Sequence, residues 1–208
     1  VDQVVQAAVR GQGVALVRYD CKTIHLVRGC RIDGGYGFMA TTTKEEVVRL
    51  VNADEWIDGD KTLTVGGTQF LIRHVGPSHM PEDLVVYLPK EKVLFAGDLV
   101  FRNRIPFVGQ ADSGRWIQAL DVLLKFDATT IVPGHGPLSG EARKDMQQTR
   151  DYLVYLRATM GEAARNLEPF EEAYQAADWS RFEKLPLFRV ANRMNAYNTY
   201  LLMEHESK

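Results

Sequence analysis

The sequence predicts an α/β protein with a mixed sheet, in which some neighbouring strands run parallel and others antiparallel. Three observations support this class. Short apolar or alternating runs typical of strands fall within residues 61–96 and recur at 129–132. The Gly66-Gly67 pair between two of these runs is typical of a tight hairpin turn, which joins antiparallel strands. Apolar residues at helical spacing occur between and after the strand-like runs, as the helices of an α/β fold require.

Composition places the chain among ordinary globular proteins and excludes several functions. Its 208 residues are 45% hydrophobic and 25% charged, as is usual for a folded domain. The 25 basic and 27 acidic residues give a formal net charge of −2, so no strongly basic field is expected to hold nucleic acid or an anionic membrane. No apolar run approaches the ~20 residues that span a bilayer. The start at Val1 shows no signal-peptide pattern, which leaves the compartment open between the cytoplasm and the periplasm.

The N-terminal part is the hardest to interpret. Val4–Val9 is mildly amphipathic, Val14–Val17 suits a short strand, and Asp20–Gly37 shows no period. A capping-box pattern at Thr42–Glu46, followed by apolar residues at helical spacing, predicts a helix that ends near Asn52.

Five strands are predicted after this helix. Lys61–Val65 and Thr68–Val75 both alternate and form the hairpin. Leu84–Leu88 and Val93–Ala96 are continuous apolar runs separated by a turn, and Thr129–Val132 is one more short strand. Continuous apolar runs suit strands that are covered on both faces.

Helices account for the remainder. A helix with Ser113 as its N-cap precedes the last strand, and another runs from just after Ser139 to about Arg165. The tail, Leu167–Lys208, is predicted to be helical in pieces. Its apolar residues either pack on the core as the last helices of the domain or form an interface with a partner chain. These residues are Trp179, Phe182, Leu185, Leu187, Phe188, Tyr197, Tyr200, Leu201 and Leu202.

Three polar side chains directly follow apolar strand-like runs. They are His79, Asp98 and His135, and each is flanked by glycine or proline. Any one of them alone would more often be a turn or surface residue, and His74 is interpreted in that way as structural. Because the carboxyl ends of buried strands often meet at one edge of an α/β sheet, the three together predict a shared site. Two imidazoles and a carboxylate are a suitable ligand set for a divalent metal.

The segments that hold these residues resemble the later motifs of the metallo-β-lactamase superfamily. They are Gly76–Leu84, Leu94–Asp98 and Val132–Gly136. Three further segments are most similar to the branch of sulfur-oxidation-associated and quinoprotein-relay metallohydrolases. These are Phe101–Pro106, Trp116–Leu124 and Asn195–Leu201. The resemblance covers roughly residues 38–205.

This resemblance implies a four-layer αβ/βα sandwich with metals at one edge between two sheets. It implies that His79 is a ligand of the first metal, His135 a ligand of the second, and Asp98 the bridging carboxylate, which also orients the attacking water. Zinc is the expected metal, as one or two ions, with iron or manganese as alternatives. Arg102 and Arg104 follow Asp98 and either meet an anionic small-molecule substrate or are solvated loop charges.

One departure from the family pattern matters as much as the match. The family's first signature, His-x-His-x-Asp-His, does not occur in these 208 residues. Its expected place, residues 19–28, reads Tyr-Asp-Cys-Lys-Thr-Ile-His-Leu-Val-Arg, so the N-terminal half is expected to be incomplete or degenerate. Cys21, His25 and Cys30 either supply replacement ligands or are plain thiols and a surface imidazole; the two cysteines could also form a disulfide.

Two functional hypotheses follow. The first is a metal-dependent hydrolase acting on an ester, thioester, lactam or similar bond. Its metal site could be smaller than in the family, with a single zinc or Fe(II) ion held by the three ligands. The second is a catalytically inactive scaffold or oligomeric binding module, with a homodimer as one form. We expect residues 1–140 to form the metallo-β-lactamase-like domain, with 1–37 atypical, and 141–208 to be a helical extension packed on it.

Overall fold

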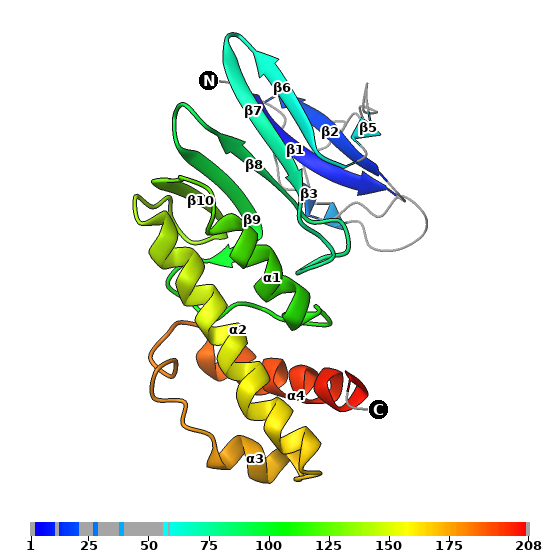
Figure 1. The fold of residues 1–208 in the computed structure, drawn as a ribbon, viewed down its shortest axis with the longest axis vertical. Coiled ribbons are helices and arrows are strands. Elements are labelled where there is room, and N and C mark those ends of the chain that lie inside the picture. Colours follow the sequence, from blue (N-terminus) through cyan, green and yellow to red (C-terminus); the bar gives the residue numbers. More distant parts are fainter. Residues whose placement is uncertain are drawn as a thin grey trace. The chain divides into compact units, whose positions relative to one another are not determined.

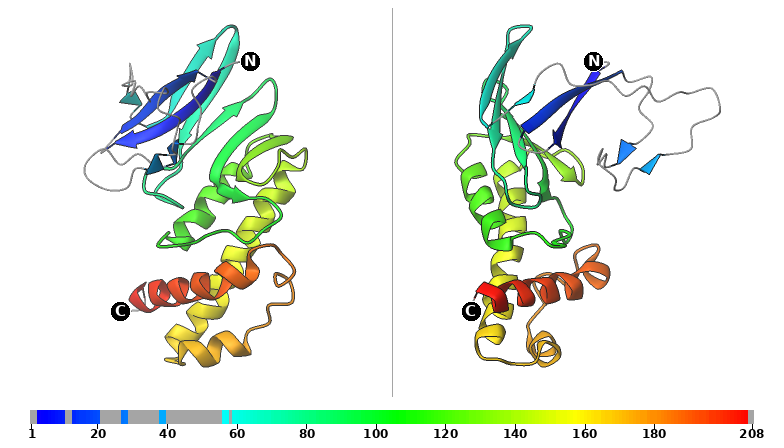
Figure 2. Two further views of the ribbon diagram at one scale, coloured as in Figure 1. Left: turned by 180° about the vertical axis from the view of Figure 1, so that it is seen from behind. Right: turned by 90° about the vertical axis from the view of Figure 1, so that its right-hand side faces the viewer.

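The computed structural model describes residues 3–10, 13–20, 27–28, 38–39, 56–57 and 59–206. The chain divides into two compact units, Val1–Asp60 and Lys61–Lys208 (Figures 1 and 2). None of the helices in the described ranges is long and apolar enough to cross a lipid bilayer.

The first unit contains two small antiparallel sheets. In one, β1 (Gln3–Arg10) pairs with β2 (Gly13–Asp20), which also pairs with β5 (Trp56–Ile57). In the other, β3 (Val27–Arg28) pairs with β4 (Phe38–Met39). The strand predicted at residues 14–17 is thereby confirmed as part of β2. The helix predicted to end near residue 52 lies outside the described residues.

The second unit is built on one five-stranded mixed sheet with the order β10-β9-β8-β7-β6. Only the β10–β9 pair is parallel, so the predicted mixed sheet is confirmed. The Gly66-Gly67 turn has positive φ at both residues, as a two-residue hairpin turn requires. The strands are β6 (Lys61–Val65), β7 (Thr68–His74), β8 (Leu84–Leu88), β9 (Val93–Phe101) and β10 (Thr130–His135).

Strand β9 extends past its predicted end at residue 96 and includes Asp98. Gly97 adopts φ 53°, a conformation that glycine accepts without strain, and three buried apolar residues then continue the strand to Phe101. Its neighbour β10 likewise extends to His135, with register shifts around Pro133. Two of the three predicted site residues therefore lie within strands rather than in the loops after them.

Four helices complete this unit. The N-cap of α1 is Asp112 rather than Ser113, because the Asp112 carboxylate accepts a hydrogen bond from the backbone N–H of Arg115 at 3.0 Å. The long helix predicted after residue 139 is confirmed as α2. The helices are α1 (Ser113–Leu123), α2 (Ala142–Arg165), α3 (Phe170–Ala176) and α4 (Phe188–Glu206).

The hydrophobic core lies where α1 and α2 pack on the sheet, and α4 in turn packs across α2 (Figures 1 and 2). Leu94, Trp116 and Leu153 are fully buried in it. Burying a side chain of this size contributes roughly 1.5–3 kcal/mol. Trp116 also satisfies its indole nitrogen, which donates to the Leu99 carbonyl at 3.0 Å.

Apolar side chains of the tail occupy two different environments. Trp179, Phe182, Leu185 and Phe188 pack on the core, in agreement with the first alternative for this segment. Leu187 and other apolar side chains remain exposed. The predicted division of the chain at residue 140 stays a prediction.

Candidate metal centre

Asp98 and His135 lie next to each other on the neighbouring strands β9 and β10. The Nε2 atom of His135 is 3.4 Å from Oδ1 of Asp98, and both side chains are partly open to solvent. This approach depends on Gly134, because a Cβ atom there would lie 2.0 Å from Asp98 Oδ1 and 2.6 Å from Asp98 N. Position 134 of β10 therefore has to be a glycine for the two strands to approach in this way.

The separation of these two donor atoms suits a shared divalent ion. Zinc binds nitrogen and carboxylate oxygen at about 2.0–2.2 Å with tetrahedral angles, which places two ligand atoms of one ion about 3.4 Å apart. The observed 3.4 Å between His135 Nε2 and Asp98 Oδ1 matches that spacing. The pair consequently fits as two ligands of one ion.

His79 lies in the loop between β7 and β8. Its Nε2 atom is 3.1 Å from the carbonyl oxygen of Phe107, and its ring packs edge-on against Trp116 with centroids 4.8 Å apart. Its Nδ1 atom is buried and has no hydrogen-bond partner among the described residues. The rings of His79 and His135 both pack on Phe101, at centroid distances of 6.0 and 4.6 Å. The Phe101 ring therefore contacts both imidazoles.

The structure brings together two of the three predicted ligands. Within the described ranges, no group of three or more His, Cys, Asp or Glu side chains is arranged to hold a metal ion. His79 is held near the Phe107 carbonyl and does not join Asp98 and His135 in such a group. Cys21, His25 and Cys30 lie outside the described residues. The assignment of His79, Asp98 and His135 as metal ligands stays a prediction.

The loop that carries His79 is closed by Asp83. Its Oδ2 atom accepts hydrogen bonds from the Ser78 hydroxyl at 2.7 Å and from the backbone N–H of Met80 at 2.6 Å. These two residues flank His79, so the carboxylate fixes the backbone on both sides of the imidazole. A carboxylate four residues after the histidine is a local sequence signal for such a turn.

The two arginines after Asp98 are placed differently. The Arg102 guanidinium lies 3.3 Å from the buried carboxylate of Asp145 on α2 and donates to the Leu138 carbonyl. Its charge is therefore used to compensate Asp145. Arg104 has a buried Nε atom without a hydrogen-bond partner in the described part of the chain.

A polar cluster on α4 also reaches the site. The Asn195 side chain is fully buried, accepts from the backbone N–H of Val108 at 2.9 Å and donates to the Pro106 carbonyl at 2.7 Å. It therefore holds the segment that presents the Phe107 carbonyl to His79. In the sequence, only the family resemblance singles out Asn195, because its hydrogen-bond partners are 87 and 89 residues away in the chain.

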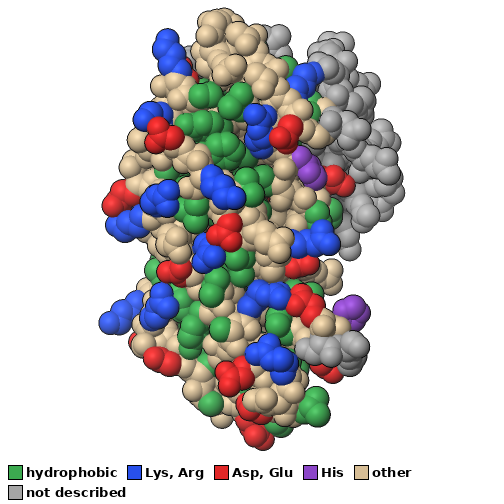
Figure 3. Space-filling view, viewed as in Figure 1, with side chains coloured by type: hydrophobic (Ala, Val, Ile, Leu, Met, Phe, Trp, Pro, Cys, Tyr) green, Lys and Arg blue, Asp and Glu red, His purple; other side chains and the backbone are tan. Residues whose placement is uncertain are grey.

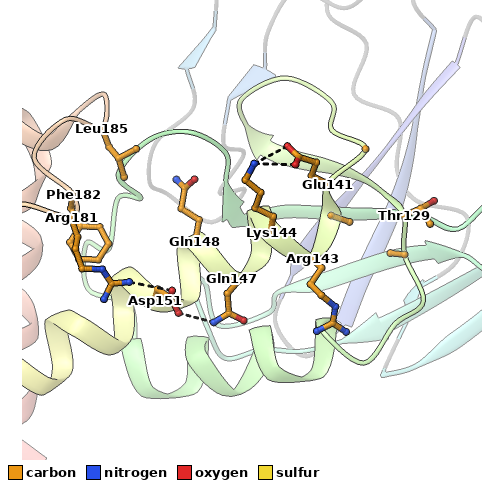
Figure 4. Close-up of a pocket in the computed structure, with 13 residues that line it drawn as sticks. Thr129, Glu141, Arg143, Lys144, Gln147, Gln148, Asp151, Arg181, Phe182 and Leu185 are labelled. Carbon is orange, nitrogen blue, oxygen red and sulfur yellow. Dashed lines mark hydrogen bonds and ion pairs between the residues drawn. The ribbon is translucent and has the colours of Figure 1, made fainter.

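The structure also has a cavity of about 820 Å³ that none of the predicted site residues lines (Figure 4). Its charged side chains are largely paired with one another, Lys144 with Glu141 and Arg181 with Asp151. On the face shown in Figure 3, basic and acidic side chains are interspersed. This face therefore shows no extended field of one sign.

Comparison with known proteins identifies the family. The profile described as the metallo-beta-lactamase superfamily matches residues 27–135, which is more than half of the chain. The chain belongs to the metallo-β-lactamase superfamily, and the resemblance of its motifs is confirmed at that level. The more specific branch stays a prediction.

Individual relatives agree with this assignment. The chain is 32% identical over 102 residues to a linear primary-alkylsulfatase of Pseudomonas sp., covering 45% of this chain and 19% of that protein. It is 34% identical over 84 residues to the metallo-beta-lactamase type 2 of Bacteroides fragilis, covering 38% of this chain and 34% of that one. The matched region thus spans only between a fifth and about a third of these relatives.

A solved structure supports the fold alone. The sec-alkylsulfatase Pisa1 of Pseudomonas sp. superposes with a TM-score of 0.56 at 20% identity, covering 70% of this chain and 25% of that chain. Together with the mixed sheet, this confirms the predicted α/β class and the metallo-β-lactamase fold.

Proposed function

We propose that this chain is a metal-dependent hydrolase that holds one metal ion instead of two and acts on an ester, thioester, lactam or similar bond of a small molecule. The observation that supports the proposal most directly is the Asp98–His135 pair, whose donor atoms have the spacing of two ligands of one zinc ion. The names of the relatives, an alkylsulfatase and a β-lactamase, point to hydrolysis of a sulfate ester or of a lactam.

In this proposal, Asp98 and His135 hold the ion and His79 is the third proposed ligand. His79 is retained because its ring contacts the same Phe101 ring as His135 does. A bound divalent ion would lower the pKa of water to near 7 and so supply hydroxide at neutral pH. Asp98 orients the attacking water with a carboxylate that is 46% exposed, which leaves it accessible to a substrate. Arg104 is the better candidate for meeting an anionic group, because Arg102 is paired with Asp145.

Metal content and turnover test this proposal. We expect the purified chain to bind zinc with a stoichiometry near one, and Asp98→Asn and His135→Ala to reduce its zinc affinity by more than about tenfold. His205→Ala is the matched control, because His205 is an exposed histidine in the last turn of α4. A panel of sulfate-ester, carboxylic-ester, thioester and lactam substrates measures turnover. Failure to bind zinc, manganese or iron, together with no turnover after these metals are added, would contradict the proposal.

A second candidate is an inactive metallo-β-lactamase-fold scaffold. It is favoured by the absence of the His-x-His-x-Asp-His signature from the 208 residues and of a three-ligand group from the described ones. This candidate predicts that EDTA, His79→Ala and His135→Ala leave the melting temperature nearly unchanged. A large decrease in melting temperature on adding EDTA would exclude it in favour of the hydrolase.

A further inference from the structure

Asp145 on α2 is a buried carboxylate that takes no part in the proposed reaction. It is 3% exposed, and charged side chains are seldom buried so completely unless they are paired. Its partner is Arg102, which directly follows β9 and whose Nε atom is 3.3 Å from Asp145 Oδ2. A buried ion pair adds little net stability compared with apolar residues of the same size, because both charges lose their water. The pair therefore calls for a role other than stability.

Arg102 contacts both ends of the loop 135–138. Its backbone N–H donates to the His135 carbonyl at 2.9 Å, and its Nη1 atom donates to the Leu138 carbonyl at 3.2 Å. Between these two residues, Gly136 has φ 104°, and a Cβ atom there would lie 2.8 Å from both the Cβ atom and the carbonyl oxygen of Arg102. Almost any residue at position 102 could make the backbone bond. The bond to Leu138 and the ion pair are what require an arginine.

Helix α2 also holds Phe101, the residue before Arg102. The Phe101 backbone N–H donates to the hydroxyl of Thr149 at 3.2 Å, and Thr149 lies one helical turn after Asp145. The Phe101 ring in turn stacks on the His135 imidazole, with centroids 4.6 Å apart and an angle of 21° between the planes. Helix α2 therefore anchors two residues that contact His135, one through its ring and the other through its backbone.

We propose that Arg102 is a positioning residue for His135, and that its ion pair with Asp145 anchors the loop 135–138 to α2 and so keeps His135 beside Asp98. The 3.4 Å between His135 Nε2 and Asp98 Oδ1 depends on where the backbone of this loop lies. Removing such an outer partner commonly lowers metal affinity roughly 10–100-fold. The consequence for a metal rests on the proposed function, whereas the placement of His135 does not.

Zinc titration by calorimetry separates positioning from stability. The double variant Arg102→Met/Asp145→Leu has lost both charges, so it should regain much of the melting temperature that Arg102→Met loses. It still lacks the bond to the Leu138 carbonyl, so we expect both variants to bind zinc at least about tenfold more weakly than the unmodified chain. Zinc affinity that recovers in the double variant together with stability would overturn the proposal, because Arg102 would then act through stability alone.

Arg150→Met is the matched control. Arg150 lies on α2, its Nε atom is 2.6 Å from Asp121 Oδ1, and its side chain is 27% exposed compared with 19% for Arg102. Because this pair joins α2 to α1 rather than to the loop 135–138, the variant should bind zinc as the unmodified chain does. An equal loss of zinc affinity in Arg150→Met would count against a specific role for Arg102.

The NMR signals of the histidine rings in the metal-free protein provide a readout that needs no metal. We expect the His135 signals to shift in Arg102→Met and in the double variant, and those of His205, in the last turn of α4, to stay where they are. If the unmodified chain binds no metal, the proposed hydrolase fails, and these spectra still decide whether Arg102 positions His135. Unchanged His135 signals in the double variant would overturn the inference.

Discussion

The Asn195 side chain accepts a hydrogen bond from the backbone N–H of Val108 at 2.9 Å, across 87 residues of sequence. The same amide donates to the Pro106 carbonyl, so it is hydrogen-bonded to the backbone on both sides of Phe107. The Phe107 carbonyl is in turn the hydrogen-bonding neighbour of His79. Helix α4 thereby determines the position of a backbone group in the candidate metal centre.

Asn195→Ala should destabilise the protein and disturb His79 together. The substitution leaves the buried N–H of Val108 and the Pro106 carbonyl without this partner, which costs roughly 2–4 kcal/mol of unfolding free energy. Urea unfolding measures the loss, and the NMR signals of the His79 ring report on its environment. Asn198→Ala is the matched control, because Asn198 makes one bond to the Gly109 carbonyl and should cost about 1 kcal/mol. Equal losses in the two variants would contradict the proposal that Asn195 fixes the backbone around Phe107 through its two hydrogen bonds.

Gly134→Ala should separate Asp98 from His135. A Cβ at position 134 would overlap Asp98, so one of the strands must move, at a cost of about 1–3 kcal/mol. We expect zinc affinity, measured by calorimetric titration, to fall with stability. Gly140→Ala provides the control, because a Cβ there meets open space and should leave both quantities unchanged. Unchanged zinc binding in Gly134→Ala would show that the Asp98–His135 contact is not needed for the metal.

Local patterns predicted the parts of this structure that depend on neighbouring residues. The Gly66-Gly67 hairpin and the strands around it follow from alternation and turn chemistry. The end of β9 was predicted too early, because Gly97 interrupts the apolar run, yet its positive φ lets the strand continue.

In the site, the contact that follows from the order of the strands was predictable, whereas the other long-range contacts were not. The meeting of Asp98 and His135 was predictable, because both lie toward the carboxyl ends of neighbouring parallel strands. The Phe107 carbonyl that neighbours His79 is a backbone group 28 residues away, and no side-chain pattern encodes such a contact. The Arg102–Asp145 pair is likewise long-range, so the sequence could equally suggest a substrate contact for Arg102.

Arg102→Met should be strongly destabilising even without substrate. Asp145 is 3% exposed, and removing the guanidinium leaves its carboxylate buried without that compensation, at a cost of about 3 kcal/mol. The double variant Arg102→Met/Asp145→Leu should regain much of this stability, because both charges are then absent. Thermal or urea unfolding measures both, with Arg143→Met as a control that removes an exposed arginine bonded to the Leu124 carbonyl. A fully stable Arg102→Met variant would show that Arg102 is not needed to compensate Asp145, and Arg102 would again be a candidate for contacting the substrate.

Tyr152 should make the protein less stable at high pH. Burial raises the pKa of the Tyr152 phenol above its ordinary value, although the hydrogen bond from Asn195 acts in the opposite direction. The unfolded chain ionises this phenol near pH 10, whereas the folded protein keeps it neutral to higher pH. Its contribution to stability is therefore complete below about pH 10 and is lost as the pH rises further. Urea unfolding between about pH 9 and 11 should show a steeper loss in the unmodified chain than in Tyr152→Phe. Burial also raises the pKa of Tyr87, so the double variant Tyr87→Phe/Tyr152→Phe should be flatter still. An identical slope in the unmodified chain and in Tyr152→Phe would show that this phenol does not stay neutral in the folded protein.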